Sequence, residues 1–220
     1  MDNKLRTTTK LLGVTALLAV TTNALAVESV TSTATVTVQN SFTFTESSAI
    51  DFGTIRAAAS PTGDATNGSD TEAKPTEDVA TLIVASANSA TTTTSGTNAI
   101  IQELLPAAAG VYTVAGVAPY SNLTITLPAL TAANPIKLTP GSLPPGAAYF
   151  WMYGFEATVT SGANNNTAYS VDGDLTADLN GDASFTVGAT LATSFPTSTV
   201  NQGAYQDVAY TGDYIITVDY

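Results

Sequence analysis

The chain has 220 residues with 18 acidic and 6 basic side chains, which gives a formal net charge of −12. This charge repels phosphate backbones and anionic lipid, so nucleic acid is not expected as a partner. The absence of His and Cys removes serine–His triads, thiol nucleophiles and ordinary zinc sites. We therefore expect a protein that is not an enzyme.

The first 26 residues have the order of a cleaved secretory signal. Three basic residues precede an apolar run at residues 11–20, and Ala24 and Ala26 follow it. The apolar run is about half the roughly 20 residues that a membrane-spanning helix needs, and no later segment replaces it. We expect cleavage after Ala26 and export through the periplasm to the cell surface or medium. The remaining domain, residues 27–220, would not span the membrane; its three basic and seventeen acidic residues give it a net charge of −14.

Alternation with a period of two predicts the first strand at residues 31–44. Ala34, Val36 and Val38 share one face and Thr residues the other. Residues 50–55 follow as a second strand. Gly53 interrupts that strand's apolar alternation, which indicates a bulge or a close approach of another backbone.

Two tracts of small and polar residues predict surface loops at residues 59–78 and 86–98. Both are rich in Ser, Thr, Gly, Asn and Asp and have almost no large apolar side chains, so we expect no contribution to the core. A strand at residues 79–84 separates them. Residues 99–105 are the one segment expected to form a helical turn or two, which Pro106 would end.

The rest of the chain predicts strands at short spacing, each bounded by Gly, Pro, Asn or Asp. They fall at residues 111–117, 123–127, 148–159, 168–171, 184–191 and 210–220. In the last of them, alternation places Tyr214, Ile216, Val218 and Tyr220 on one face. This spacing is typical of an antiparallel sandwich or barrel, and nothing divides it into two cores. We expect one all-β antiparallel domain with two long loops.

The acidic run at residues 172–182 is the candidate metal site. Calcium prefers clustered hard oxygen donors on a flexible loop, and this run offers Asp172, Asp174, Asp178, Asn180 and Asp182. It departs from the usual calcium loop because Ala183 and Ala189 stand at the positions of the loop Gly and of the closing Glu. The alternative is an acidic hairpin turn, since Asn-Gly is a strong turn signal. A weakly bound calcium ion is the one cofactor considered.

A cluster of aromatic residues precedes residue 156. Tyr149, Trp151 and Tyr153 are candidate contacts for a ligand or partner, because a sugar stacks on an exposed ring. Alternation places Phe155 with these three rings and puts Phe150 and Met152 on the opposite face, so at least one face is core. Core packing of the candidate rings is the alternative.

The acidic residues Asp51 and Glu156 fall on predicted strands and not in turns. A glycosidase needs two facing carboxylates, and Asp51 and Glu156 are the candidates in this chain. Solvent-facing alternation favours the simpler interpretation that both belong to a solvated face.

Several motifs occur in an order that suggests a family. An alternating strand at residues 34–38 is followed by Ile50-Asp51-Phe52-Gly53-Thr54-Ile55, then by residues 112–116, 123–128, 185–191, 203–205 and 214–220. This order resembles the secreted bacterial proteins grouped as domain of unknown function 4402. The resemblance implies an immunoglobulin-like or pilin-like β-sandwich and a structural subunit of a fimbria or surface coat. Its partners would be copies of itself or other surface subunits, bound through β-strand pairing.

The alternative function is a monomeric secreted module that adheres to glycan or matrix.

The chain also departs from one known class of fimbrial subunit. Subunits of the chaperone–usher kind carry a separate N-terminal donor strand and a disulfide. This chain has no Cys, and only residues 27–30 precede its first expected strand, which is short for a donor.

Overall fold

A computed structural model describes residues 33–36, 41–61, 73, 77–94, 96–142, 147–162, 164–170, 174–195 and 204–220. The chain divides into two units, Met1–Thr37 and Val38–Tyr220. The expected signal at residues 1–26 lies outside the described residues. In the first unit, residues 33–36 are exposed and form no strand.

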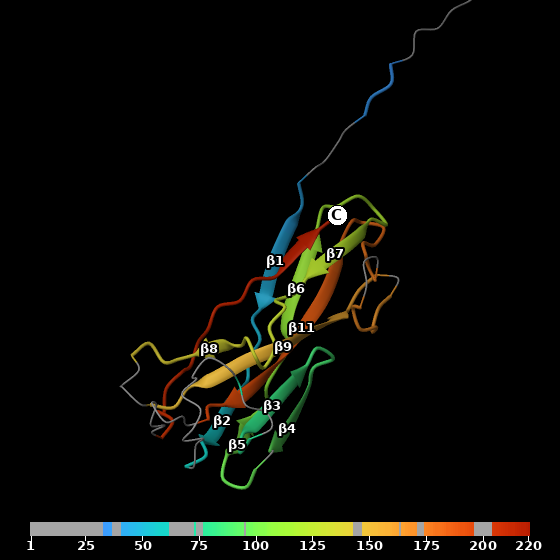
Figure 1. The fold of residues 1–220 in the computed structure, drawn as a ribbon. Coiled ribbons are helices and arrows are strands. Elements are labelled where there is room, and N and C mark those ends of the chain that lie inside the picture. The colour runs from blue at the N-terminus through green and yellow to red at the C-terminus, as the bar shows by residue number, and fades with distance from the viewer. Residues whose placement is uncertain are drawn as a thin grey trace, which may run out of the picture. The chain divides into compact units, whose positions relative to one another are not determined.

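The second unit is built from antiparallel strands, and its described residues contain no helix (Figure 1). The strands are β1 (Thr43–Ser48), β2 (Thr54–Ala58), β3 (Ala80–Ala85), β4 (Ser89–Thr94), β5 (Ile100–Leu105), β6 (Gly110–Ala115), β7 (Asn122–Thr126), β8 (Ile136–Leu138), β9 (Phe150–Val159), β10 (Leu175–Thr176), β11 (Ala183–Thr193) and β12 (Thr217–Asp219). The predicted all-β antiparallel class is confirmed.

The long strand β11 lies at the centre of the main sheet. One of its edges pairs with β6 in the first half and with β3 in the second half, and the other edge pairs with β9. The sheet continues outward through β1 next to β6, β4 next to β3 and β8 next to β9. The main sheet therefore has two ends, each of which needs a covering layer for its apolar face.

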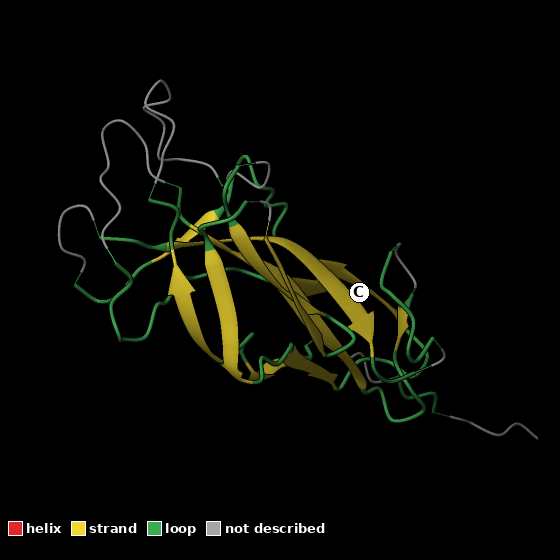
Figure 2. Ribbon diagram, turned by 90° about the horizontal axis from the view of Figure 1, so that it is seen from below, coloured by secondary structure: helices red, strands yellow, loops and turns green. Residues whose placement is uncertain are grey.

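Two small sheets supply that cover. The sheet β10-β7-β12 covers the end built from β6, and the pair β2-β5 covers the end built from β3. The first interface buries Phe185, which stacks on Tyr112 at a ring-centroid distance of 5.4 Å. The second interface buries Leu82, Met152 and Leu191. Figure 2 shows the curled strands of this sandwich-like arrangement.

The first strand begins later than alternation predicts. β1 starts at Thr43, which pairs with Ala115, the last residue of β6. Beyond that pair β6 offers no backbone for hydrogen bonds, so the sheet ends there. The prediction of one strand over residues 31–44 is wrong for the described residues 33–36, and Val36 is 85% exposed.

The second expected loop is a hairpin instead. Residues 86–98 contain β4, which pairs along its whole length with β3 through a turn where Asn88 has φ 61°. Thr is β-branched and fits the pleated surface, so a Thr-rich tract of low complexity pairs readily when a partner strand is adjacent. The side chains of β4 are all exposed, which is why no apolar alternation marks it.

Residues 99–105 were predicted to form a helical turn, and that is wrong. They form β5, whose register with β2 runs from Ala58 opposite Ile100 to Thr54 opposite Leu105. Six apolar and polar residues are too few for a stable isolated helix, so pairing with β2 decides their conformation.

The first expected loop, at residues 59–78, contributes more than predicted. Ser60 and Ala73 are buried, and Ala73 joins a cluster on the outer face of the main sheet with Tyr149 and Trp151. The expectation that this tract adds nothing to the core is therefore wrong at these described positions.

A bulge in β9 changes which face its aromatic residues occupy. Tyr153 pairs with Thr190 and Glu156 with Gly188, so two residues of β9 face one of β11 at Gly154, which has φ 67°. The extra residue reverses the alternation after that point. Phe155 therefore packs in the inner core with Phe150, and its expected placement beside Tyr153 is wrong.

Residues 214–218 follow the predicted alternation, although only β12 is hydrogen-bonded as a strand, and Tyr220 is exposed. Tyr214 and Ile216 are half-buried against the core and Val218 is buried, whereas Ile215 is 77% exposed. Residues 204–216 lie against the core as a strand-free segment.

Candidate binding groove

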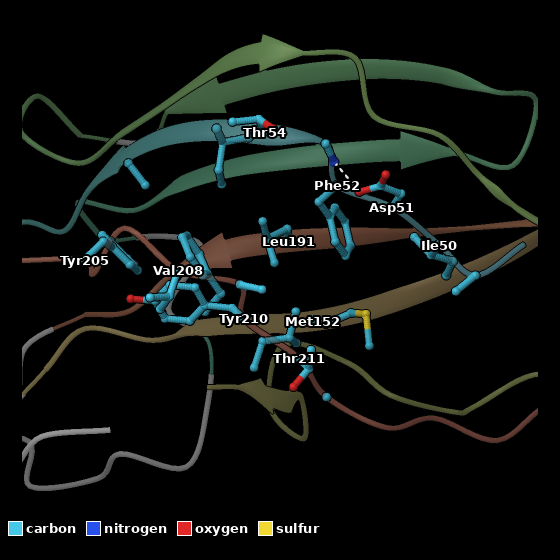
Figure 3. A pocket seen from close by; sticks show the side chains of 18 of the residues that line it. Ile50, Asp51, Phe52, Thr54, Met152, Leu191, Tyr205, Val208, Tyr210 and Thr211 are labelled. Carbon is cyan, nitrogen blue, oxygen red and sulfur yellow. Dashed lines mark hydrogen bonds between the residues drawn. The ribbon is translucent and has the colours of Figure 1, made fainter. Parts of the chain in front are cut away.

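An apolar groove of about 610 Å³ opens in the layer that covers the second core. One wall is residues 49–57, which lead into and include most of β2, and the other wall is residues 205–214. The floor consists of side chains from β8, β9 and β11: Leu138, Phe150, Met152 and Leu191. In Figure 3, Leu191 lies between Phe52 on one side and Val208 and Tyr210 on the other.

Gly53 shapes the first wall. Its φ is 70°, and a Cβ on it would overlap the carbonyl oxygen of Leu105. The Asp51 carboxylate accepts a hydrogen bond of 2.8 Å from the Gly53 N–H, while the Asp51 backbone exchanges hydrogen bonds with Ala108. This tight turn next to Phe52 confirms the close backbone approach expected from the sequence.

Tyr205 anchors the start of the second wall. Its ring stacks on Phe150 with centroids 4.2 Å apart, and its hydroxyl donates to the Tyr149 carbonyl at 3.0 Å. The same hydroxyl accepts the N–H of Ser194 at 3.0 Å. Burial raises the pKa of Tyr205 above its usual value, so the phenol stays neutral and can keep donating.

Tyr214 anchors the other end of this wall. Its hydroxyl lies 2.8 Å from the hydroxyl of Tyr112 in β6 and accepts the Ile50 N–H at 3.3 Å. Between the two anchors, Tyr210 meets Phe150 edge to face and accepts the N–H of Gln206. Side chains thus hold the segment in place.

The backbones of both walls have open pairing capacity. Within the described residues β2 pairs only with β5, and Thr54, Ile55 and Ala57 of β2 line the groove. With other described residues, residues 206–216 pair through their backbone only at Thr211, which exchanges two hydrogen bonds of 3.0 Å with Thr139. The groove is suited to binding an extended peptide segment. Its apolar floor offers area to bury, and its two walls offer backbone donors and acceptors.

The aromatic candidates do not line this groove. Tyr149 and Trp151 are 2% and 4% exposed and pack edge to face, on the outer side of the main sheet. The Lys137 ammonium lies 3.6 Å from the centre of the Tyr149 ring and 5.6 Å from that of Trp151. Tyr153 is half-buried, and desolvation raises its pKa. For Tyr149 and Trp151 the structure gives the core-packing alternative, since neither ring exposes a face.

The acidic candidates for a metal site hold their own turns. Asp178 accepts the N–H groups of Asp182 and Asn180 at 3.0 and 2.7 Å, and these bonds lower its pKa. Asp174 accepts the N–H of Ser170 at 2.8 Å. Asp172 lies outside the described residues. Within the part of the chain that is described, no three acidic side chains come together as a metal site.

The two strand carboxylates also bind backbone. Glu156 in β9 accepts two hydrogen bonds from Ser86, the residue that follows the end of β3. The backbone N–H donates at 2.8 Å and the hydroxyl at 3.3 Å. Asp51 holds the turn at Gly53, on the rim of the groove. The two residues take part in different hydrogen-bonded turns.

Sequence reasoning missed the groove. The predicted terminal strand, residues 210–220, includes only the later part of its second wall, and the spacing of Tyr205, Tyr210 and Tyr214 among Gly and Asp is unlike a regular alternation. That spacing was the available signal for a segment held by side chains.

A comparison with protein-family models, with curated proteins and with solved structures finds no match for this chain. No helix among the described residues is long and apolar enough to cross a membrane.

Proposed function

We propose that the chain is an exported, non-enzymatic structural subunit of a fimbria or surface coat, which associates with copies of itself or with other surface subunits through β-strand pairing. The apolar groove between β2 and residues 205–214 is the observation that carries the proposal. Among the described residues, β2 has one strand partner and residues 207–210 have no backbone partner, so the groove offers backbone donors and acceptors to a strand of another subunit.

The composition supports a role without catalysis. The chain has no His and no Cys, so acid–base or nucleophilic chemistry would depend on carboxylates. The two carboxylates on or beside strands, Asp51 and Glu156, are engaged with backbone N–H groups in separate turns. A carboxylate that holds a turn supports the fold.

The alternative, a monomeric module that binds glycan or matrix, draws less support. Stacking on a sugar needs an exposed aromatic face, and Trp151, the only Trp in the sequence, is buried together with Tyr149. This alternative remains as an outcome of the test below.

The test is the assembly state of the purified exported protein. Light scattering and negative-stain microscopy over a range of concentrations, with and without calcium, should find multimers or filaments. A chain of this charge repels its copies at low ionic strength, so physiological salt is the proper condition. A monomer at every concentration would contradict the proposal and would direct the search to glycan screening.

A further inference from the structure

We infer that copies of the chain also contact one another head to tail. In this contact the outer face of the β2–β5 pair in one copy receives the tip of the next copy, which consists of the turns at residues 118–121 and 178–182. The inference rests on the proposed self-association and adds to it a contact that side chains form outside the groove.

The outer face of the β2–β5 pair is apolar around one cation. Ile55, Ala57 and Ile101 pack into the second core, so the alternate residues of both strands point away from it. These outward residues form the β2–β5 face: Arg56, Ala58, Ile100, Gln102 and Leu104. Arg56 is paired opposite Gln102, with the exposed side chains of Ile100 and Leu104 on either side of that pair. Exposed apolar area of this kind is typical of a surface that meets another protein.

The tip presents two further large apolar side chains on a fixed support. Its turns hold each other, because the Tyr120 N–H donates to the Asp178 carbonyl at 3.3 Å. Gly181 approaches the other turn so closely that a Cβ on it would overlap the Val117 carbonyl oxygen. Tyr120 and Leu179 nevertheless stay 66% and 68% exposed. The tip is therefore a preformed apolar surface.

Charge is complementary between the face and the tip. No described acidic side chain forms an ion pair with Arg56. In the tip, Asp182 is exposed, and none of the described donors forms a hydrogen bond with its carboxylate. A guanidinium and a carboxylate attract each other more strongly where apolar side chains exclude water, and Arg and Tyr contribute most at protein interfaces. The cation of the face thus matches the anion of the tip.

The acidity of the chain shows why this cation matters between copies. Seventeen acidic and three basic residues follow residue 26, so copies repel one another unless opposite charges meet where they touch. Of the three basic residues, Lys74 lies outside the described residues and Lys137 lies over the Tyr149 ring. Among the described residues, Arg56 is therefore the cation that is available to a second copy.

The face and the tip lie at opposite ends of β11. Asp182 directly precedes β11, whose first half pairs with β6, and the β2–β5 pair covers the end where β11 pairs with β3. Figure 1 shows β2 and β5 at one end of the sheet and β7 at the other. The 11 residues of β11 span about 36 Å at about 3.3 Å each, so a copy cannot place its own tip on its own face. A contact between two unlike surfaces leaves one of each open, and its repetition gives a chain or ring of copies.

The experiment exchanges the two charges in the full exported chain. Arg56→Asp and Asp182→Arg each bring like charges together at the contact. Each variant alone should need at least about a tenfold higher protein concentration than the wild type to form multimers. An equimolar mixture of the two variants should assemble like the wild type, because every face then meets a tip of opposite charge. Light scattering in physiological salt measures all of these samples.

Two further variants serve as controls. Asp213→Arg makes the same charge change as Asp182→Arg at an exposed residue outside the face and the tip. It should assemble at least as well as the wild type, since it lowers the repulsion between copies. Leu179→Ser tests the contact without a change of charge and at an exposed position, where the fold does not depend on the side chain. It should also raise the concentration that assembly needs.

The outcomes distinguish this inference from the proposed function. Arg56→Asp or Leu179→Ser chains that assemble at the wild-type concentration overturn the inference, while self-association stands. A mixture of Arg56→Asp and Asp182→Arg that stays monomeric, although both variants keep the wild-type circular dichroism, overturns it as well. A wild-type chain that stays monomeric at every concentration contradicts the proposed function itself and the inference with it.

Discussion

The phenolic oxygens of Tyr112 and Tyr214 lie 2.8 Å apart and join the main sheet to the C-terminal segment. Tyr112 stands in β6 and is 3% exposed, and burial is the main reason why its pKa lies above the usual value. Tyr214 also accepts the N–H of Ile50. One phenol thus fixes the distance between the two walls at one end of the groove.

Replacing Tyr214 by Phe should therefore destabilise the fold. The substitution leaves the buried Tyr112 hydroxyl and the Ile50 N–H without this partner, which costs about 1–3 kcal/mol. Urea unfolding followed by circular dichroism measures the loss. Tyr120→Phe is the control, because Tyr120 is 66% exposed and should change stability by less than about 0.5 kcal/mol. Equal stability of the two variants would contradict the role of Tyr214.

Gly53→Ala should lower the free energy of unfolding more than the same substitution at an unconstrained glycine. The positive φ and the overlap with the Leu105 carbonyl together make a cost of about 1–3 kcal/mol the expected result. Gly141→Ala is the matched control, since a Cβ there meets nothing within 4 Å. Thermal unfolding of both variants checks the difference. A Gly53→Ala protein that melts with the control would show that the turn is not constrained.

Acid should weaken the hydrogen bonds that the Asp78 carboxylate accepts from residues 98 and 99, because protonation removes its negative charge. The Asp78 carboxylate accepts the Ala99 and Asn98 N–H groups at 3.0 Å and the Ser60 hydroxyl at 2.9 Å. These bonds, the one from Ala99 foremost, lower the pKa of Asp78 from 3.8 to about 2. A depressed folded-state pKa stabilises the fold above the unfolded value, and this stability is lost as pH falls from about 4 to about 2.

Asp78→Asn removes that titration, so its stability should change less than the wild type's over this pH range. Urea unfolding at steps between pH 5 and pH 2 measures both proteins, with the exposed Asp219→Asn as the control. Parallel pH profiles for the wild type and Asp78→Asn would contradict the assignment.

The single Trp reports directly on the aromatic cluster. Because Trp151 is 4% exposed, its emission in the folded protein should be blue-shifted and shielded from acrylamide, and unfolding should remove both effects. Strong quenching in the folded state would mean an exposed ring and would favour the glycan-binding alternative.

Lys137→Met should lower the free energy of unfolding by about 0.5–1 kcal/mol, because it removes the cation from the Tyr149 ring.

Local pattern predicted several strands whose apolar residues recur at a period of two. β6, β7, β11 and the alternation at residues 214–218 fall where apolar periodicity placed them. The same rule failed in β9 beyond Gly154, because one extra residue in a bulge exchanges the two faces; Gly154 itself was the local signal for that bulge. It also failed at β4, whose exposed Thr side chains carry no alternation.

The groove depends on contacts between residues far apart in the chain. Phe52 and Val208 line one cavity because Tyr214 and Tyr205 position the C-terminal segment through hydroxyl bonds to other elements. Such bonds follow no period in the sequence. The acidic run was visible in the sequence, but only the structure shows that Asp178 Oδ1 accepts two backbone N–H groups of its own turn.

Hydrogen exchange of the backbone amides in the assembled protein tests the central claim most directly. If a strand of a neighbouring subunit pairs with the walls of the groove, amides in β2 and in residues 206–210 should exchange more slowly in the multimer than in the monomer that is present at low protein concentration, because they gain partners. Unchanged exchange at both walls, with protection instead at the β4 edge, would contradict the account.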